Sequence, residues 1–285
     1  MSTLAPPAAG ALPSQEAVMA KAEHENFTVA SAVLGRRRRT HLMAIYGFAR
    51  LVDDVGDEVA GDRGALLDGI EADLDRIYGG RAPQHAVMTT LAQSVWACRL
   101  PDSPFRRLIA ANRLDQTVTR YNTFQQLLDY CQLSAAPVGE LVLHVFGVAT
   151  AERILLSDRT CAGLQVTEHL QDVAEDHARG RVYLPREDLA RFGCNEDDIA
   201  ATRPSASYRA LIAFEAQRAR SLLGDGAPLA RTLPLRPRMA VAGFVAGGRS
   251  ALDALDLAGG PGAGVRPERS RRSFAIGFAQ AAVGR

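Results

Sequence analysis

Residues 163–185 read GLQVTEHLQDVAEDHARGRVYLP, and this stretch decides the fold and the site expected for the chain. Side chains three and four positions apart share one face of a helix. Gln165, Glu168, Asp172 and Asp176 therefore form one polar stripe, and the apolar residues between them fall on other faces, where they can pack. The stretch predicts an amphipathic helix that carries a ladder of acids.

Aligned carboxylates repel one another unless a cation neutralises them, and oxygen ligands suit a hard cation such as Mg²⁺. Gly180 and Pro185 enclose a loop that carries Arg181 and Tyr183, so a cation and a phenol follow directly after the acids. A solvated acidic helix face is the plain alternative. It would be preferred if this stretch stood alone, but a similar ladder lies upstream.

The upstream ladder belongs to a long helix that we expect to begin after Thr40 as its N-cap. Its polar face carries Tyr46, Arg50, Asp53, Asp54 and Asp57. A simple ion pair within the helix is the alternative role for Arg50. Gly56 costs about 1 kcal/mol relative to alanine in an exposed helix interior. That cost indicates a close approach or a functional position.

The composition predicts an all-α protein. The chain has 285 residues, a formal charge of +1, four cysteines without metal-ligand spacing, and no recurring alternation typical of strands. We expect a disordered leader over residues 1–14, one helical domain over 15–257, and a flexible linker with a basic tail over 258–285. The charge gives no reason to expect nucleic acid. We expect a cytoplasmic protein, because no signal peptide or membrane-spanning segment is recognisable.

Apolar periodicity predicts further helices. They cover residues 15–34, 66–78, 84–98, 105–119, 124–131, 136–149, 207–223 and 238–256. Arg36–Arg39 is expected to be a basic loop, either solvated or facing phosphate or a membrane. The two acid ladders fit facing walls of one central cavity in a helical bundle, where Mg²⁺ would bind a diphosphate.

Two motifs carry a resemblance to a known family. AIYGFARLVDDVGDE (44–58) and QVTEHLQDVAEDHARGRVYLP (165–185) are similar to the first and second aspartate motifs of the squalene/phytoene synthase family, and the resemblance covers roughly Glu23–Leu257. It implies an isoprenoid-synthase helical bundle. Within the family, residues 24–31 and 134–147 look most like the bacterial hopanoid-pathway branch. That branch implies Mg²⁺-dependent conversion of presqualene diphosphate to hydroxysqualene and diphosphate.

The resemblance also implies roles for individual residues. The metal ligands would be Asp53, Asp57, Asp172 and Asp176, with Asp54 adjacent and Glu168 where the family usually has asparagine. The groups that approach the diphosphate would be Tyr46, Arg50, Gln165, Arg181 and Tyr183, with Asn26 in a flanking segment. Gln171 stands where condensing members often have arginine, and this fits the hopanoid branch.

Two alternatives remain open at this point. An enzyme of the same fold that condenses two prenyl diphosphates head to head would use the same acids. A non-catalytic binding or assembly protein of this fold would show degenerate motifs, whereas only Glu168 departs here. Peripheral contact with a membrane is a separate expectation, which rests on the oily substrate and the basic tail. Partners in the squalene or hopanoid pathway are expected on the same resemblance.

Overall fold

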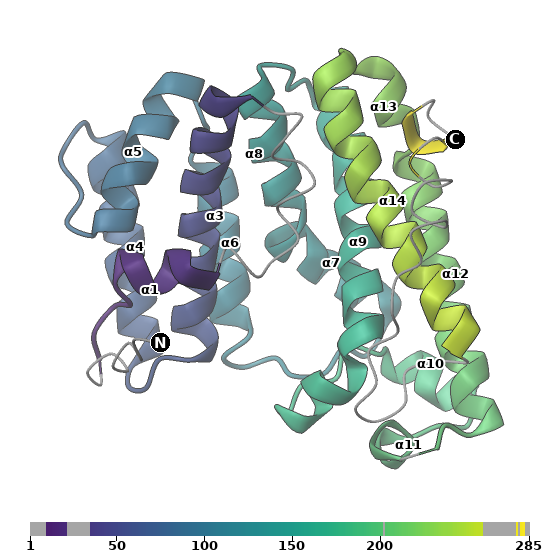
Figure 1. The fold of residues 1–285 in the computed structure, drawn as a ribbon. Helices are drawn as coiled ribbons and strands as arrows, with labels where there is room; N and C mark the ends of the chain where they lie inside the picture. Colours follow the sequence, from purple (N-terminus) through teal and green to yellow (C-terminus); the bar gives the residue numbers. More distant parts are fainter. Residues whose placement is uncertain (1–9, 22–34, 202, 259–277, 279, 283–285) are drawn as a thin grey trace. The chain divides into compact units, whose positions relative to one another are not determined.

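The computed structural model describes residues 10–21, 35–201, 203–258, 278 and 280–282, and these residues form helices (Figure 1). The helices are α1 (Gln15–Ala20), α3 (Arg36–Asp57), α4 (Arg63–Tyr78), α5 (Ala86–Cys98), α6 (Ser103–Leu114), α7 (Phe124–Ser134), α8 (Ala136–Phe146), α9 (Ala151–Ala178), α10 (Arg186–Arg191), α11 (Glu196–Ala200), α12 (Ala206–Gly226), α13 (Pro228–Thr232) and α14 (Leu235–Ala258). No strand occurs in this part of the chain; there is an isolated bridge between Arg120 and Val182. The predicted all-α class is confirmed.

The chain divides into two compact units, and each carries one acid ladder. The first unit runs to Thr117 and also includes Glu140–Ala149, and the second comprises Val118–Gly139 and the chain from Thr150 onward. The expectations of one ordered domain over residues 15–257 and of a central cavity flanked by both ladders stay predictions.

Helix α3 is the centre of the first unit, where it contacts α1, α4, α5 and α6. Phe48, Leu51, Val52 and Val55 recur at helical spacing and are fully buried. The Phe48 ring meets Phe105 of α6 edge to face, with 4.9 Å between the ring centroids. This packing fixes α3 while Asp53 and Asp57 remain exposed on its surface.

Helix α9 is the centre of the second unit, where it contacts α7, α11, α12, α13 and α14. Its approach to α12 is close enough to exclude side chains. A Cβ at Gly163 would lie 2.9 Å from Leu223 Cγ and 3.0 Å from the Leu223 backbone nitrogen. A Cβ at Gly226 would in turn lie 2.8 Å from the backbone nitrogen of Thr160. Gly163 and Gly226 therefore allow the close distance between α12 and α9, the helix that carries the second ladder.

The start of the first acid helix was predicted wrongly. Thr40 is not an N-cap, because α3 begins at Arg36 and the Thr40 hydroxyl donates to the Arg36 carbonyl at 3.2 Å, within the helix. The basic loop expected at Arg36–Arg39 is therefore the first turn of α3. Gly35 precedes it with φ +74°, a backbone conformation that glycine adopts readily, so the chain can turn directly into the helix.

The ends of the chain were predicted in part. The expected helix over 15–34 is observed as Gln15–Ala20, and the remainder from residue 22, like residues 1–9 of the leader, lies outside the described residues. Most of the predicted linker and tail does as well. Of the tail, Phe278, Ala281 and Ala282 pack against α14, and Ala281 is buried. No helix of the described residues is long and apolar enough to cross a membrane.

Candidate active site

The first acid ladder is shaped by a close contact between α3 and α6. Asn112 is buried in α6 and donates from Nδ2 to Asp53 Oδ1 at 3.0 Å. A Cβ at Gly56 would lie 2.1 Å from Asn112 Oδ1, so only glycine leaves room for this side chain. The close approach inferred from the cost of Gly56 is confirmed. Gly56 leaves the space that Asn112 occupies while it donates to Asp53.

The electrostatics of Asp53 reflect its neighbours. Solvent reaches its side chain, yet desolvation by the surrounding protein raises the pKa of Asp53 to about 6. The hydrogen bond from Asn112 and the charge of Arg50 lower this pKa, while the charges of Asp57 and Asp54 raise it. The acids on this face therefore repel one another, which is the property that the ladder pattern predicted.

Asp54 and Arg50 belong to an ion-pair network in the first unit. Asp54 is buried and lies 2.7 Å from Arg50 Nε and 2.9 Å from Lys21 Nζ. Glu58 also binds both cations, at 3.0 Å from Arg50 NH2 and 2.7 Å from Lys21 Nζ. Burial opposes the charge of Lys21, but its bonds to Glu58 and Asp54 raise the pKa of Lys21 overall. Asp54 is thus already neutralised by two cations.

The second acid ladder lies in the last three turns of α9. Glu168 is exposed, whereas Asp172 and Asp176 are half-buried. His169 is buried on the same helix, with Nδ1 3.9 Å from Asp176 Oδ2 and Nε2 3.3 Å from Gln165 Nε2. His169 thus lies between Gln165 and Asp176 along the helix and contacts Gln165 more closely.

The loop after α9 is tied to the segment before α7. The Arg181 amide donates to the Asp176 carbonyl at 2.8 Å, which closes the end of the helix. The next amide, Val182, donates to the Thr119 carbonyl at 2.9 Å. Val182 is buried between two half-buried residues, Arg181 and Tyr183. The backbone of both predicted diphosphate-binding residues is thereby fixed.

Arg120 strengthens this attachment from its side chain. It donates from NH1 to the Gly180 carbonyl at 2.6 Å and to the Thr119 carbonyl at 2.8 Å. It also binds Glu196 with both remaining nitrogens, at 2.6 and 2.8 Å. The hydrogen bond from Arg120 holds the pKa of Glu196 below its usual range, and the charge of His177 adds to this effect. Arg120 is thus the side chain that joins the start of the loop to the segment before α7 and to α11.

Aromatic rings surround Tyr183. Its ring stacks on His169 with centroids 3.7 Å apart and on Tyr121 at 5.7 Å, and Tyr130 of α7 lies 5.8 Å away. Sequence reasoning missed His169, Tyr121 and Tyr130. A signal existed for Tyr130, since it is a phenol on the apolar face of a short amphipathic helix. Tyr121 lies in the irregular segment before α7, where periodicity gives no information.

A buried acid faces the same part of the second unit. Glu215 of α12 is 1 % exposed, and its Oε1 lies 3.3 Å from Arg218 NH1, which also binds buried Asp188 at 2.6 Å. Desolvation raises the pKa of Glu215 to about 8. Glu215 lines a cavity of about 10 Å³ together with His169, Tyr183 and other residues of this unit. Such a volume holds about one water molecule.

The donor set fits a hard cation. Among the described residues, no group of three or more acids, histidines or cysteines is close enough to hold a metal by itself. Mg²⁺ does not require one, because it is usually held by one or two carboxylates, with water and substrate phosphates as its other ligands. Asp53 with Asp57, and Asp172 with Asp176, supply such pairs one helical turn apart. The assignment of these residues, Glu168 and Asp54 to metal stays a prediction, and Asn26 lies outside the described residues.

Comparison with known proteins places these ladders in a family. The sequence pattern of squalene/phytoene synthase matches residues 20–273. The chain belongs to this family. The squalene/phytoene synthase resemblance that the two motifs implied is therefore confirmed.

Individual members of the squalene/phytoene synthase family are also similar to the chain. A hydroxysqualene synthase of Rhodopseudomonas palustris is 37 % identical over 207 residues, which cover 72 % of this chain and 70 % of that protein. A phytoene synthase of Mycobacterium bovis is 34 % identical over 199 residues, or 68 % of this chain and 65 % of that protein. The crystal structure of squalene synthase HpnC from Alicyclobacillus acidocaldarius superposes with a TM-score of 0.80 and 42 % identity, covering 86 % of this chain and 94 % of that one. The chain is an isoprenoid-biosynthesis enzyme of the hydroxysqualene, squalene and phytoene synthase type.

Proposed function

We propose that the enzyme converts presqualene diphosphate and water to hydroxysqualene and diphosphate. The carbon–oxygen bond to the diphosphate breaks, the cyclopropylcarbinyl cation rearranges and opens, and water adds to the resulting cation with loss of a proton. No reductant is consumed. The 37 % identity to a hydroxysqualene synthase over most of the chain supports this reaction, as does Gln171 before the second pair of acids. The product would enter hopanoid biosynthesis.

The observation that carries the proposal is the clamped loop after α9. Its backbone is bonded at Arg181 and Val182, and Arg120 binds the carbonyl of Gly180. These bonds hold the loop that carries Arg181 and Tyr183, and this loop follows directly after the helix that carries Asp172 and Asp176. A guanidinium and a phenol fixed in this way need little reorganisation as charge builds on a leaving diphosphate, which is the condition for electrostatic stabilisation of the transition state.

Mg²⁺ is the cofactor that these acids fit. We propose that Asp53 and Asp57 hold it in the first unit, and Asp172 and Asp176 in the second. When bound, Mg²⁺ neutralises the charge that develops on the departing diphosphate. In our proposal Asp54 does not bind Mg²⁺, because Arg50 and Lys21 already neutralise its charge.

The residues of the chain have separate tasks in this reaction. Asn112 orients Asp53 toward its ligand, and Arg120 keeps Arg181 and Tyr183 in place. Arg181 donates hydrogen bonds to the diphosphate oxygens, for which a guanidinium is well suited. The aromatic rings of His169, Tyr121 and Tyr130 hold the Tyr183 ring from its sides.

Head-to-head condensation of two prenyl diphosphates is the second candidate function. It is favoured by the 34 % identity to a phytoene synthase, and the same acids would serve it. A non-catalytic role is not kept, because the family and the names of its members indicate an enzyme. Gln171 weighs against condensation, since the chain has no guanidinium there for a second diphosphate.

Separate incubations with two substrates decide between the candidates. Purified protein with Mg²⁺ receives presqualene diphosphate in one sample and farnesyl diphosphate in the other, and products are identified by mass spectrometry. We expect hydroxysqualene from the first and no consumption in the second. Asp172→Asn should abolish product formation and keep the far-ultraviolet circular dichroism spectrum. Consumption of farnesyl diphosphate alone would show that the enzyme condenses.

A further inference from the structure

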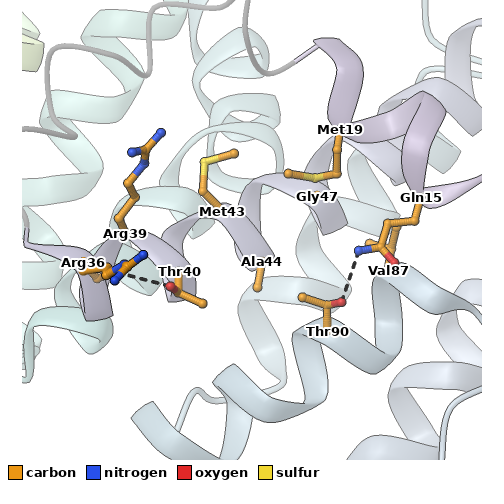
Figure 2. Close-up of a pocket in the computed structure, with 10 residues that line it drawn as sticks. All are labelled: Gln15, Met19, Arg36, Arg39, Thr40, Met43, Ala44, Gly47, Val87 and Thr90. Carbon is orange, nitrogen blue, oxygen red and sulfur yellow. Dashed lines mark hydrogen bonds between the residues drawn. The ribbon is translucent and has the colours of Figure 1, made fainter.

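A second pocket lies in the first unit, on a different set of residues from the acid ladder. It has a volume of about 370 Å³ and is formed by α1, α3 and α5. Its lining is Gln15, Met19, Arg36, Arg39, Thr40, Met43, Ala44, Gly47, Val87 and Thr90. Figure 2 shows arginines at one end, Gln15 and Thr90 at the other, and methionines between them. The volume is at the small end of the range for small-molecule sites.

Small residues on α3 give this pocket its depth. Ala44 and Gly47 are buried, and a Cβ at Gly47 would lie 3.2 Å from Met19 Sδ and 3.5 Å from Val87 Cγ1. Met19 and Met43 are half-buried, so their side chains remain accessible along the pocket. Methionine is flexible and polarisable and adapts to apolar ligands of varied shape. From Arg36 to Gly47 the pocket follows α3 for about 16 Å.

The arginine end carries two positive charges. Arg36 and Arg39 are both exposed, and no side-chain partner of either occurs among the described residues. They lie in the first turn of α3, a helix of 22 residues with no acidic residue in that turn. The positive end of the helix dipole adds to their charge. An anion, and a phosphate above all, is the group that this end would bind.

We infer that this pocket binds one phosphate-headed hydrocarbon chain, with the phosphate on Arg36 and Arg39 and the chain along Met43 and Met19. The pocket has room for a single chain and not for the two chains of a phospholipid. This inference is independent of the proposed reaction, because none of these residues belongs to either acid ladder. A free single-chain phosphate and a lipid headgroup present the same phosphate, so the test must separate them.

Dodecyl phosphate is the probe for the free ligand. The full chain is titrated in a buffer with EDTA at probe concentrations below micelle formation, followed by isothermal calorimetry. We expect saturable binding of one molecule per chain. Affinity should rise from hexyl to dodecyl phosphate by up to about fourfold for each methylene buried. Inorganic phosphate alone should bind at least a hundredfold more weakly than dodecyl phosphate.

The arginines have a matched control within the chain. Arg36→Ala with Arg39→Ala should weaken dodecyl phosphate at least tenfold, since two charge-assisted contacts are lost. Arg37→Ala with Arg81→Ala removes the same charge from exposed residues outside the pocket, and affinity should change less than twofold. Equal weakening by both pairs would show attraction by net charge and would overturn the inference.

Methyl resonances of methionine locate the bound chain. With ¹³C-methyl methionine, dodecyl phosphate should shift the signals of Met19 and Met43 and leave those of Met88 and Met239 in place. Met88 is fully buried and Met239 lies in the second unit, so both serve as references. Shifts at Met239 alone would place the ligand elsewhere and overturn the inference. Binding to phosphatidylglycerol vesicles without binding of the free probe would do so too, since it would indicate a membrane surface contact only.

Discussion

Arg120→Ala tests whether the loop after α9 is held in place by one side chain. The variant loses hydrogen bonds to the carbonyls of Gly180 and Thr119 and a bidentate pair with Glu196. The bond to the Gly180 carbonyl contributes about 1 kcal/mol net, whereas the bond to Thr119 lies within the segment of Arg120 itself and does not hold the loop. The ion pair contributes up to about 1 kcal/mol, because the Glu196 side chain is 41 % exposed and solvent screens the charges.

The sum for the variant is at most about 2 kcal/mol of loop stability, or up to about thirtyfold in the equilibrium between ordered and open loop. Hydrogen exchange reports this directly, since the Val182 amide is bonded to the Thr119 carbonyl. We expect protection at Val182 to fall clearly, by up to that factor, and kcat/KM for the diphosphate substrate to fall with it. Helix content should not change.

Arg179→Ala is the matched control for this variant. Arg179 directly precedes Gly180 in the chain and pairs with Glu175 at 2.8 Å, but both side chains are well exposed, at 65 % and 60 %. Such a pair contributes little. Protection and turnover in Arg179→Ala should stay within twofold of the native chain. Unchanged protection at Val182 in Arg120→Ala would refute the claim that Arg120 holds the loop. Equal losses of protection and turnover in both variants would show that the loss of positive charge near the loop, and not the bonds of Arg120, causes the effect.

Three further changes test the packing and the charges. Gly56→Ala should displace Asn112, because no Cβ fits there. We expect the free energy of unfolding in denaturant titrations to fall by about 1–3 kcal/mol, and turnover to fall as well. Gly163→Val should destabilise by several kcal/mol, as α9 and α12 cannot separate without opening the core at Leu223; a loss below 1 kcal/mol would contradict this. Glu215 has a folded pKa of about 8, above the ordinary value of 4.5, so its favourable contribution is complete below pH 4.5 and is lost as pH rises toward 8. Glu215→Gln should therefore gain stability relative to the native chain by up to about 1.4 kcal/mol per pH unit across that window, whereas a pH-independent difference would show that the burial of Glu215 does not raise its pKa.

Periodicity was sufficient to predict that the long helices exist, but the first twelve residues of α9, Ala151–Ala162, were not predicted. The apolar spacing of α3, α4, α9, α12 and α14 is regular over many turns. Their helical structure could therefore be predicted from local sequence, without knowledge of contacts between distant residues. The boundaries depended on local backbone geometry instead. Thr40 has the chemistry of an N-cap, but Gly35 adopts a positive φ and allows the helix to start earlier. Arginine is a good helix former, and this favours Arg36–Arg39 in the first turn, although the positive end of the helix dipole opposes their charge.

The candidate site was predictable as two motifs and not as contacts. The acids, Arg181 and Tyr183 follow from spacing and from the family resemblance. Arg120 and Asn112 act across sequence separations of about 60 residues, which no local pattern encodes. Gly56 is the exception, since a glycine that interrupts a helix already indicated a close neighbour. The short helices α10, α11 and α13 span too few turns for periodicity to reveal them.

Reaction in oxygen-18 water tests the proposed chemistry most directly. The purified enzyme, Mg²⁺ and presqualene diphosphate are incubated in labelled water, and the alcohol and the diphosphate are analysed separately by mass spectrometry. Because water adds to carbon after the diphosphate has left, we expect hydroxysqualene with one oxygen-18 atom and unlabelled diphosphate. An alcohol without label, with the label in the phosphate product, would mean that water attacks phosphorus and would contradict ionisation and water capture.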